Sequence, residues 1–250
     1  MNLIIDIGNT RVKAALFNGA TLVESKVYGT VNAILLDTAF ISSAKKAIIG
    51  TVMKEQEDFC SALNAIIPTI IFNSETKIPL TNLYQSASTL GSDRLTASIG
   101  AYYLYPNANV LVIDAGTCIK YNFTNSKNEY LGGGISPGIQ MKFKALQTFT
   151  SKLPLVEADF SYNELIGNNT QNSILSGVLN GTIAEIDGVI DYYKLKFTDT
   201  ICVLTGGDSE YLAKRLKNSI FAHQNLVLKG LNHILNYNIA KSSLDDEELK

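Results

Sequence analysis

The feature that most constrains the fold is a segment that occurs twice. Residues 3–10 read LIIDIGNT and residues 111–117 read LVIDAGT. Each copy is an apolar run that ends in Asp-x-Gly and a hydroxyl or amide residue, and two more strand-like segments follow it. In the first copy these segments flank Asn18-Gly19, a pair typical of a type I′ hairpin turn. The duplication predicts two related lobes, each of which opens with a three-stranded meander.

Helices and short strands follow each meander. The pattern predicts further strands at 46–52, 69–72 and 199–204, and helices at 55–66, 93–105, 137–149, 170–194, 209–216 and 225–237. Strands followed by helices, twice over, indicate an α/β fold of two lobes, and ligand sites favour a cleft between lobes. We expect an N-terminal lobe at 1–106, a C-terminal lobe at 107–240 and a flexible acidic tail at 241–250.

The composition excludes several classes of protein. Charged residues make up 18% of the 250 residues and the net charge is −2, which argues against a disordered polyelectrolyte and a dedicated nucleic-acid binder. The three cysteines have no paired spacing, so neither a disulfide framework nor a zinc cluster is expected. No signal segment and no membrane-spanning apolar run is visible. We therefore expect a cytoplasmic protein with no nucleic-acid or membrane partner.

Three glycine-containing turns have residues that could bind a cation and phosphate groups. An Asp at a strand end beside a glycine turn can hold a cation, and the N–H groups of such a turn can bind phosphate oxygens. Asp6 and Asp114 stand in the two duplicated turns, and residues 205–208 (TGGD) form a third turn between a buried strand and a helix. The geometry of the third turn suits the adenosine or phosphate part of a nucleotide. Together the three turns predict an ATP site.

The complete set of motifs resembles the type III pantothenate kinases of the actin/hexokinase/Hsp70 superfamily. The motifs that carry the resemblance are DIGNTRVK at 6–13, GSDR at 91–94, DAGT at 114–117, GGGISPG at 132–138 and TGGD at 205–208. The resemblance implies two ribonuclease-H-like lobes and ATP-dependent phosphorylation of pantothenate to 4'-phosphopantothenate, the first step of coenzyme A biosynthesis. It also implies a homodimer that uses Mg²⁺ and a monovalent cation, K⁺ or NH₄⁺.

The resemblance assigns roles around the first turn. Asp6 would hold magnesium against the ATP phosphates, since Mg²⁺ takes one or two carboxylates plus phosphates and waters. Lys13 would neutralise charge on the transferred phosphoryl group, although it could also be a solvated edge-strand lysine. The phosphate loop itself would be lined by Gly8, Asn9 and Thr10.

The GSDR motif would bind the acceptor. By resemblance Asp93 is the general base that takes the proton of the substrate's primary hydroxyl, and the Arg94 guanidinium could grip the substrate carboxylate. A Ser-Asp pair before a helix is also an ordinary N-terminal cap. Further substrate-binding residues are expected at Gly91, Ser92, Tyr84 and Thr170. Tyr84 could instead be a packing residue, and Thr170, which would reach the partner subunit's pocket, could be a helix cap.

The second turn would bind phosphate and a monovalent cation. The resemblance places Thr117 on an ATP phosphate, Asp114 at the monovalent-cation site, and Gly206 and Gly207 under the nucleotide. The chain departs from the family pattern at Lys120 and Asn122, where the family has a threonine and an aspartate. Because an added lysine could replace or repel the cation, strict potassium dependence is in doubt.

Two rival functions stay open. One is a kinase of the same fold that acts on another small anionic acceptor. The other is a non-catalytic regulatory protein that binds nucleotide without transferring phosphate, although Asp6, Lys13, Asp93 and Arg94 are all present. The apolar stripe of 174–190 could supply a dimer interface or simply belong to the core.

Overall fold

The computed structural model describes residues 1–8, 11–51 and 56–248, with side chains as far as residue 241. The chain divides into two compact units. The first unit contains residues 1–107, 124–131 and 225–250, and the second contains 108–123 and 132–224. The first boundary falls close to the predicted one. The chain then returns twice to the first unit, which differs from the predicted division into two continuous lobes.

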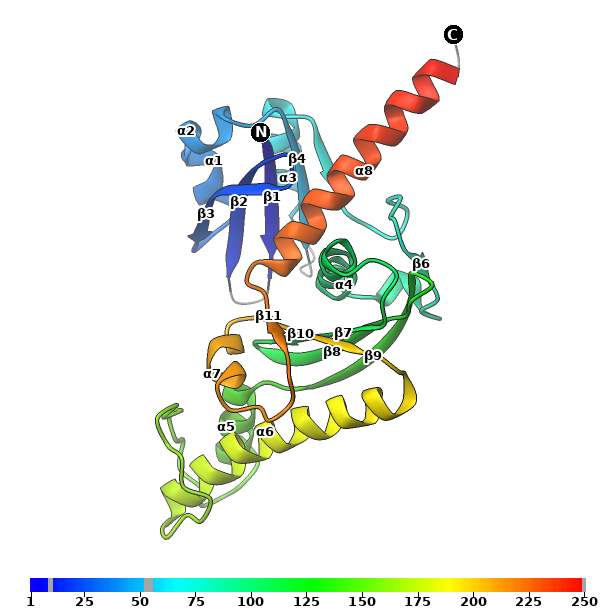
Figure 1. Ribbon diagram of the computed structural model, residues 1–250. Coiled ribbons are helices and arrows are strands. Elements are labelled where there is room, and N and C mark those ends of the chain that lie inside the picture. Colours follow the sequence, from blue (N-terminus) through cyan, green and yellow to red (C-terminus); the bar gives the residue numbers. More distant parts are fainter. Residues whose placement is uncertain (9–10, 52–55, 249–250) are drawn as a thin grey trace. The chain divides into compact units, whose positions relative to one another are not determined.

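The first unit is built on a five-stranded sheet with the order β3-β2-β1-β4-β5 (Figure 1). Its strands are β1 (Asn2–Ile7), β2 (Val12–Asn18), β3 (Thr21–Tyr28), β4 (Lys46–Thr51) and β5 (Thr69–Ile71). The first three strands form the expected antiparallel meander, and β4 and β5 add in parallel. The hairpin turn lies one residue later than predicted. Asn18 pairs with Thr21, so the turn is Gly19-Ala20, in which Gly19 has φ +60°.

Helices cover both faces of this sheet. They are α1 (Asn32–Leu36), α2 (Thr38–Ser42), α3 (Glu57–Ile66), α4 (Ser92–Leu104) and α8 (Leu226–Glu248). Within β1, Leu3, Ile5 and Ile7 pack with residues of α1, α2 and α3, whereas Ile4 packs with residues of α4 and α8. All four are fully buried. The unbroken apolar run of β1 is therefore the signature of a strand buried on both faces.

The last helix is longer than predicted and belongs to the first unit. It continues to Glu248, across most of the segment that was expected to be a flexible tail. Two glycines allow its close approach to α4: a Cβ on Gly100 would overlap the Leu226 carbonyl oxygen, and one on Gly230 would overlap the Thr96 carbonyl oxygen. The side chain of Asn2 also donates a 2.9 Å hydrogen bond to that of Asn232 on α8. The amphipathic pattern predicted a helix here without indicating which sheet it covers.

The second unit carries most of a sheet with the order β11-β10-β7-β8-β9-β6. The strands are β6 (Thr81–Asn82), β7 (Val110–Ala115), β8 (Cys118–Thr124), β9 (Glu129–Pro137), β10 (Ile201–Thr205) and β11 (Phe221–Ala222). β6 pairs with Glu129 and Tyr130, which belong to the first unit. The two-residue strands β6 and β11 are too short to give a periodic signal and were not predicted.

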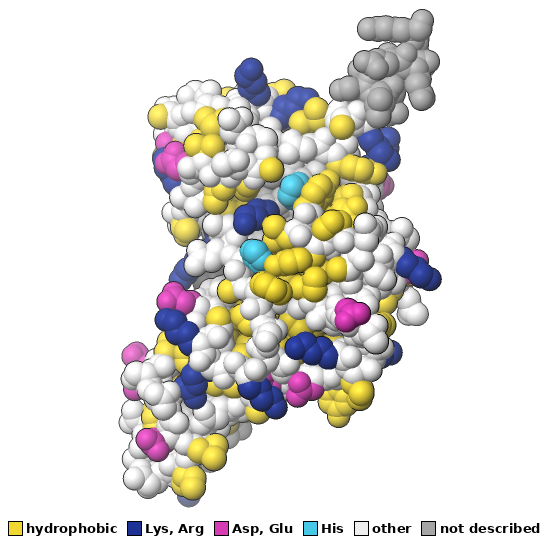
Figure 2. Space-filling model, in the orientation of Figure 1, with side chains coloured by type: hydrophobic (Ala, Val, Ile, Leu, Met, Phe, Trp, Pro, Cys, Tyr) yellow, Lys and Arg dark blue, Asp and Glu magenta, His cyan; other side chains and the backbone are white. Residues whose placement is uncertain are grey.

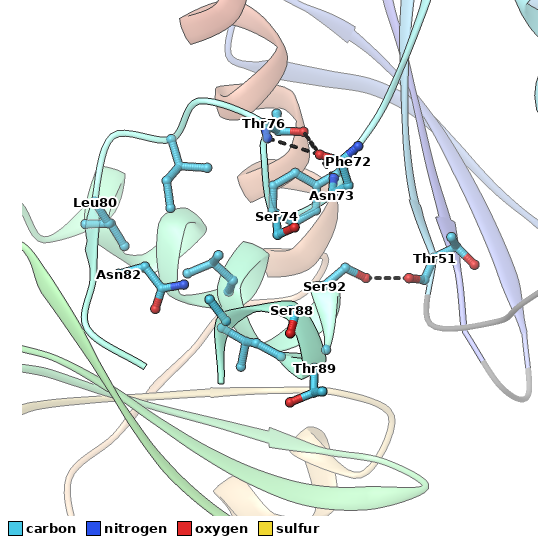
Figure 3. A pocket seen from close by; sticks show the side chains of 15 residues that line it. Thr51, Phe72, Asn73, Ser74, Thr76, Leu80, Asn82, Ser88, Thr89 and Ser92 are labelled. Carbon is cyan, nitrogen blue, oxygen red and sulfur yellow. Dashed lines mark hydrogen bonds between the residues drawn. The ribbon is translucent and has the colours of Figure 1, made fainter. Parts of the chain in front are cut away.

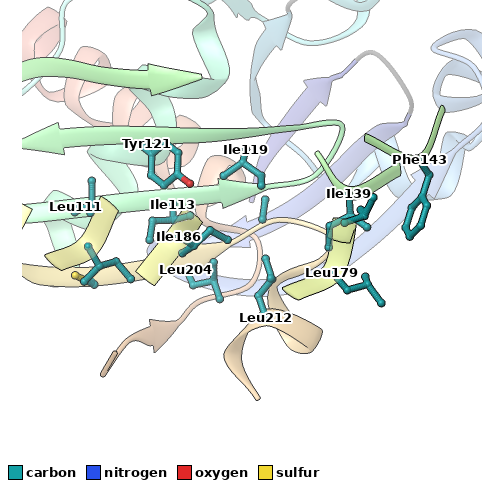
Figure 4. Packing of buried hydrophobic residues seen from close by; sticks show 14 of the residues in the cluster. Leu111, Ile113, Ile119, Tyr121, Ile139, Phe143, Leu179, Ile186, Leu204 and Leu212 are labelled. Carbon is teal, nitrogen blue, oxygen red and sulfur yellow. The ribbon is translucent and has the colours of Figure 1, made fainter. Parts of the chain in front are cut away.

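Three helices pack against this sheet: α5 (Ile139–Thr148), α6 (Thr170–Lys196) and α7 (Ser209–Ala213). Their shared core joins Leu111, Ile113 and Ile119 of the strands to Leu179 and Ile186 of α6 (Figure 4). The apolar stripe of α6 is therefore core in this chain. By length and composition α6 could span a membrane, but half of its apolar window is buried inside the fold, as in core helices.

On the side that Figure 2 shows, the surface has no large patch of one charge sign. Basic and acidic side chains are scattered there among apolar and neutral ones. This distribution agrees with the near balance of 21 basic and 23 acidic residues.

Candidate active site

The first phosphate turn places Asp6 and Lys13 at paired positions of one sheet. Asp6 on β1 is directly opposite Lys13 on β2 in the antiparallel register, so the two side chains share a face. The N–H of Gly8 donates a 3.1 Å hydrogen bond to the carbonyl of Arg11, which closes the turn. A Cβ on Gly8 would lie 3.3 Å from that oxygen, so the turn is tight. Asn9 and Thr10 lie outside the described residues.

The GSDR motif forms the start of α4, which lies next to the end of β4 although the two are far apart in the sequence. Gly91 is the N-cap residue, and it has no side chain that could accept a capping hydrogen bond. The Ser92 hydroxyl donates a 2.9 Å hydrogen bond to the carbonyl of Thr51, the last residue of β4. Asp93 lies in the first turn, where its Oδ1 accepts the Arg94 N–H at 2.9 Å. The N-cap position is thus Gly91 rather than Ser92 or Asp93, and the Asp93 carboxylate accepts one of the N–H groups of the first turn.

The structure brings Arg94 and Tyr84 together. The Arg94 side chain is almost fully buried, with 5% of the residue exposed, and its Cζ lies 5.4 Å from the centre of the Tyr84 ring. Its Nη1 also approaches the Tyr84 hydroxyl at 3.5 Å. Tyr84 in turn contacts the ring of Tyr130, with 6.3 Å between ring centres. A guanidinium held in this way has little rotational freedom, which suits bidentate binding of a carboxylate.

A cavity of about 600 Å³ opens beside the start of α4 (Figure 3). Its lining is mixed: Gly91 and Ser92 contribute to it, together with polar Asn73 and Thr76 and apolar Leu80. The Asn73 carboxamide accepts hydrogen bonds from the N–H groups of Glu75 and Thr76, so it shapes the rim. This rim was not predicted from the sequence, in which the turn-forming Asn-Ser pair at 73–74 was the available signal. Tyr84, Asp93 and Arg94 are not among the residues that line this cavity.

In the second unit the DAGT turn contacts the glycine-rich motif. The N–H of Gly116 donates to the Cys118 carbonyl at 3.0 Å, and that of Gly138 donates to the Thr117 carbonyl at 3.2 Å. A Cβ on Gly138 would overlap the carbonyl oxygens of Gly116 and Thr117. Glycine is therefore required at the end of the GGGISPG motif, because two backbones meet there.

The TGGD turn lies directly on the strand that carries Asp114. Thr205 pairs with Asp114 across the parallel strands β10 and β7, and the N–H of Asp208 donates to the Ala115 carbonyl at 3.0 Å. Gly206 has φ +98°, and a Cβ there would overlap the same carbonyl oxygen. Gly207, by contrast, is exposed and open. The predicted phosphate-contacting and adenosine turns are thus neighbours in one unit.

Burial also affects the carboxyl group of this turn. The carboxyl of Asp208 is half-buried, and desolvation raises its pKa above the usual range of an aspartate. A carboxyl in this environment accepts hydrogen bonds readily, because each one replaces lost hydration.

The second turn also contains an ion pair at Asp114, the residue predicted to bind a monovalent cation. Lys120 Nζ lies 2.9 Å from Oδ2 of Asp114, and the two side chains are 21% and 14% exposed. Asn122, the other departure from the family pattern, is fully buried. Asp114 therefore already faces a positive charge, which does not fit a monovalent-cation site at this carboxylate. Asp6, a strand-end carboxylate beside a phosphate turn, does fit Mg²⁺ shared with substrate phosphates.

Thr170 is the first residue of α6 and is exposed. The cap of this helix is Asn169, whose side chain accepts the N–H of Asn172 at 2.9 Å. The alternative interpretation of Thr170 as the helix cap is therefore wrong, and its predicted part in a partner's pocket stays a prediction.

The two sheets and their glycine turns define the actin-like ATPase fold that sugar kinases share. A ROK hexokinase from Thermus thermophilus superposes with a TM-score of 0.55 at 12% identity, covering 96% of this chain and 99% of the hexokinase. A conserved Campylobacter jejuni protein, provisionally described as a Baf family transcriptional activator, gives 0.62 at 20% identity, covering 95% and 99%. These likenesses establish the fold alone.

The chain belongs to the type III pantothenate kinase family, whose model matches residues 2–192. A type III pantothenate kinase from Cytophaga hutchinsonii is 42% identical over 239 residues, which cover 96% of this chain and 100% of the relative. Another, from Bacteroides fragilis strain YCH46, is 44% identical over 241 residues, covering 95% and 98%.

Proposed function

We propose that this protein transfers the γ-phosphoryl group of ATP to the primary hydroxyl of pantothenate, the first step of coenzyme A biosynthesis. The observation that carries this proposal is full-length similarity: relatives at 42% and 44% identity that bear this activity in their names are matched over 98% or more of their length. Such coverage means that no lobe of the relatives is missing here. We expect the enzyme to act in the cytoplasm.

The nucleotide would bind through the glycine turns. Gly206 and Gly207 would lie under the adenosine, and Thr117 would contact a phosphate. The direct contact of the TGGD turn with the DAGT strand supports this assignment, because it holds the two sets of backbone groups in fixed relation. Fixed N–H groups cradle phosphate oxygens without reorganisation during the reaction.

On the first unit, Asp6 would hold Mg²⁺, which neutralises phosphate charge when it is bound. Lys13, opposite Asp6 in the sheet register, would add a positive charge toward the transferred group. Gly8, Asn9 and Thr10 would complete the phosphate loop. Phosphoryl transfer depends mainly on positioning and on electrostatic stabilisation, which such a turn can supply.

Asp93 would accept the proton of the attacking hydroxyl. Its place in the first turn of α4, where it is partly exposed, supports this role because a substrate hydroxyl could approach the carboxylate there. Arg94, held against Tyr84, would bind the substrate carboxylate. Gly91 and Ser92 line the neighbouring cavity and would contact the rest of the substrate.

A homodimer is part of the proposal, with Thr170 reaching the partner subunit's substrate pocket. The exposure of Thr170 is compatible with such a contact. The rival interpretation, a regulatory protein that binds nucleotide without turnover, is disfavoured because Asp6, Lys13, Asp93 and Arg94 are all retained.

The test is ADP release from ATP and Mg²⁺ with pantothenate, for the wild type and the variant Asp93→Asn. Asparagine can still accept the Arg94 N–H, so the fold and ATP binding should survive while turnover falls by a factor of about 10²–10⁴, the usual contribution of a general base. Asp58→Asn, an equal change of charge at an exposed position on α3, is the matched control and should leave turnover unchanged. Near-normal turnover of Asp93→Asn would remove Asp93 from the role.

A further inference from the structure

Lys120 reaches the carboxylate at which the family resemblance predicts a monovalent cation, that of Asp114. Asp114 is the last residue but one of β7, and Lys120 is the third residue of β8, the next strand in the sheet. The tight turn between them, closed by the hydrogen bond from Gly116 N–H to the Cys118 carbonyl, returns the chain so that Lys120 Nζ reaches Asp114 Oδ2 at 2.9 Å. The pair is therefore built by the turn itself.

The local charges leave no place for a second cation. Asp114 is neutralised by Lys120, and the buried residue at 122 is a neutral asparagine. Both side chains of the pair are at least three-quarters buried, so solvent screens them less than it screens a surface pair. A monovalent ion on the same carboxylate would meet an ammonium at short range.

We propose that the Lys120 ammonium permanently replaces the monovalent cation of the second phosphate turn, so that the enzyme works without K⁺ or NH₄⁺. This inference rests on the proposed kinase function. An ammonium carries the same charge as K⁺, and a covalent tether keeps it at the turn at any salt composition. Lys120 is thus a positioning charge beside the DAGT backbone.

Removal of the Lys120 ammonium should make the activity depend on K⁺. In Lys120→Met the methionine fills a similar space without charge, and Asp114 becomes available to a free cation. In tetramethylammonium buffer, kcat/KM for ATP should fall at least about tenfold, and K⁺ should restore most of it. Wild type should change less than about twofold between the two salts at equal ionic strength. Lys120→Arg, which keeps the charge, should also remain independent of K⁺.

A matched control and a binding readout complete the experiment. Lys144→Met removes an equal charge from an exposed position on α5 and should behave as wild type in both salts. The thermal midpoint of Lys120→Met should rise as K⁺ is titrated, whereas that of Lys120→Met with Asp114→Asn should not, because ligand binding stabilises only a fold that holds the ligand.

The outcomes separate this inference from the proposed function. Wild type that is stimulated tenfold by K⁺ would overturn the inference while the kinase activity stands. Lys120→Met with unchanged activity in both salts, or a folded Lys120→Met that K⁺ does not restore, would also overturn it. No turnover of wild type with pantothenate in any salt would refute the function instead, and the thermal titration would still decide whether Lys120 occupies a cation site.

Discussion

The TGGD turn offers a paired test of how this fold builds a nucleotide site, because its two glycines have opposite surroundings. Gly206 has φ +98°, and a Cβ on it would overlap the Ala115 carbonyl oxygen. A Cβ on Gly207 would meet nothing within 4 Å. Gly206→Ala adds about 1–2 kcal/mol for a left-handed backbone and about 1–3 kcal/mol for overpacking against a strand. The free energy of unfolding should therefore fall by about 2–5 kcal/mol.

That destabilisation should appear in two assays. The thermal midpoint of Gly206→Ala should fall by at least about 4 °C, since about 1 kcal/mol shifts a chain of this length by roughly 2–4 °C. The KM for ATP should rise as well, because the displaced turn also loses the hydrogen bond from Asp208 N–H to Ala115. Gly207→Ala should keep the wild-type thermal midpoint and raise only the KM for ATP. An unchanged midpoint and KM in Gly206→Ala would refute this account of the turn.

Three further predictions follow from the described contacts. Arg94→Lys keeps the charge and loses the planar fork beside Tyr84, so the KM for pantothenate should rise at least about tenfold with little change for ATP; equal changes for both substrates would contradict the assignment. Burial lowers the pKa of His233 to about 4, so stability should fall by about 3 kcal/mol as pH drops from 6.5 to 4. His233→Phe, which can keep the stack on Tyr103, should remove that loss in urea titrations, and an undiminished loss would count against it. Glu185→Gln leaves the half-buried Lys142 ammonium without its 2.6 Å carboxylate partner and should destabilise by about 1–3 kcal/mol, more than Glu185→Gln combined with Lys142→Met.

Most of the fold could be predicted because the duplicated strands carry an unambiguous pattern. The predicted meander strands match β2, β3, β7 and β8 closely, since apolar runs bounded by turns leave few alternatives. β9 continues to Pro137, beyond the end predicted for it at residue 132. The long helices were also found from their periodicity. Of the very short elements, β5 and α7 were predicted, whereas α1, α2, β6 and β11 were not, because two to five residues give only a weak periodic signal.

The sequence pattern could not predict which sheet α8 covers. A helix with apolar residues on one face can cover any apolar sheet, and the position of α8 against α4 depends on two glycines, Gly100 and Gly230, that allow backbone contact. The hairpin turn at Gly19 illustrates the same limit on a small scale. The Asn-Gly pair predicted a turn there, but the pairing of Asn18 with Thr21 moved it by one residue.

The candidate site was found through motifs, and its detailed contacts came from the structure. The motifs identified the turns, and the structure then placed TGGD on the DAGT strand and Arg94 beside Tyr84. The sequence raised Lys120 as a departure that could replace or repel a cation. Only the 2.9 Å distance from Lys120 Nζ to Asp114 distinguishes replacement of the cation from its repulsion. Spacing along the chain does not determine the position of a lysine ammonium.

The most direct test of the central claim is ADP release by the wild-type protein with ATP, Mg²⁺ and one acceptor at a time. Pantothenate, glucose and no acceptor should be compared, since the fold is shared with sugar kinases. The account predicts turnover with pantothenate alone, together with a product whose mass is that of pantothenate plus one phosphoryl group. Turnover with glucose in place of pantothenate, or nucleotide binding by the folded protein with no turnover on any acceptor, would contradict it.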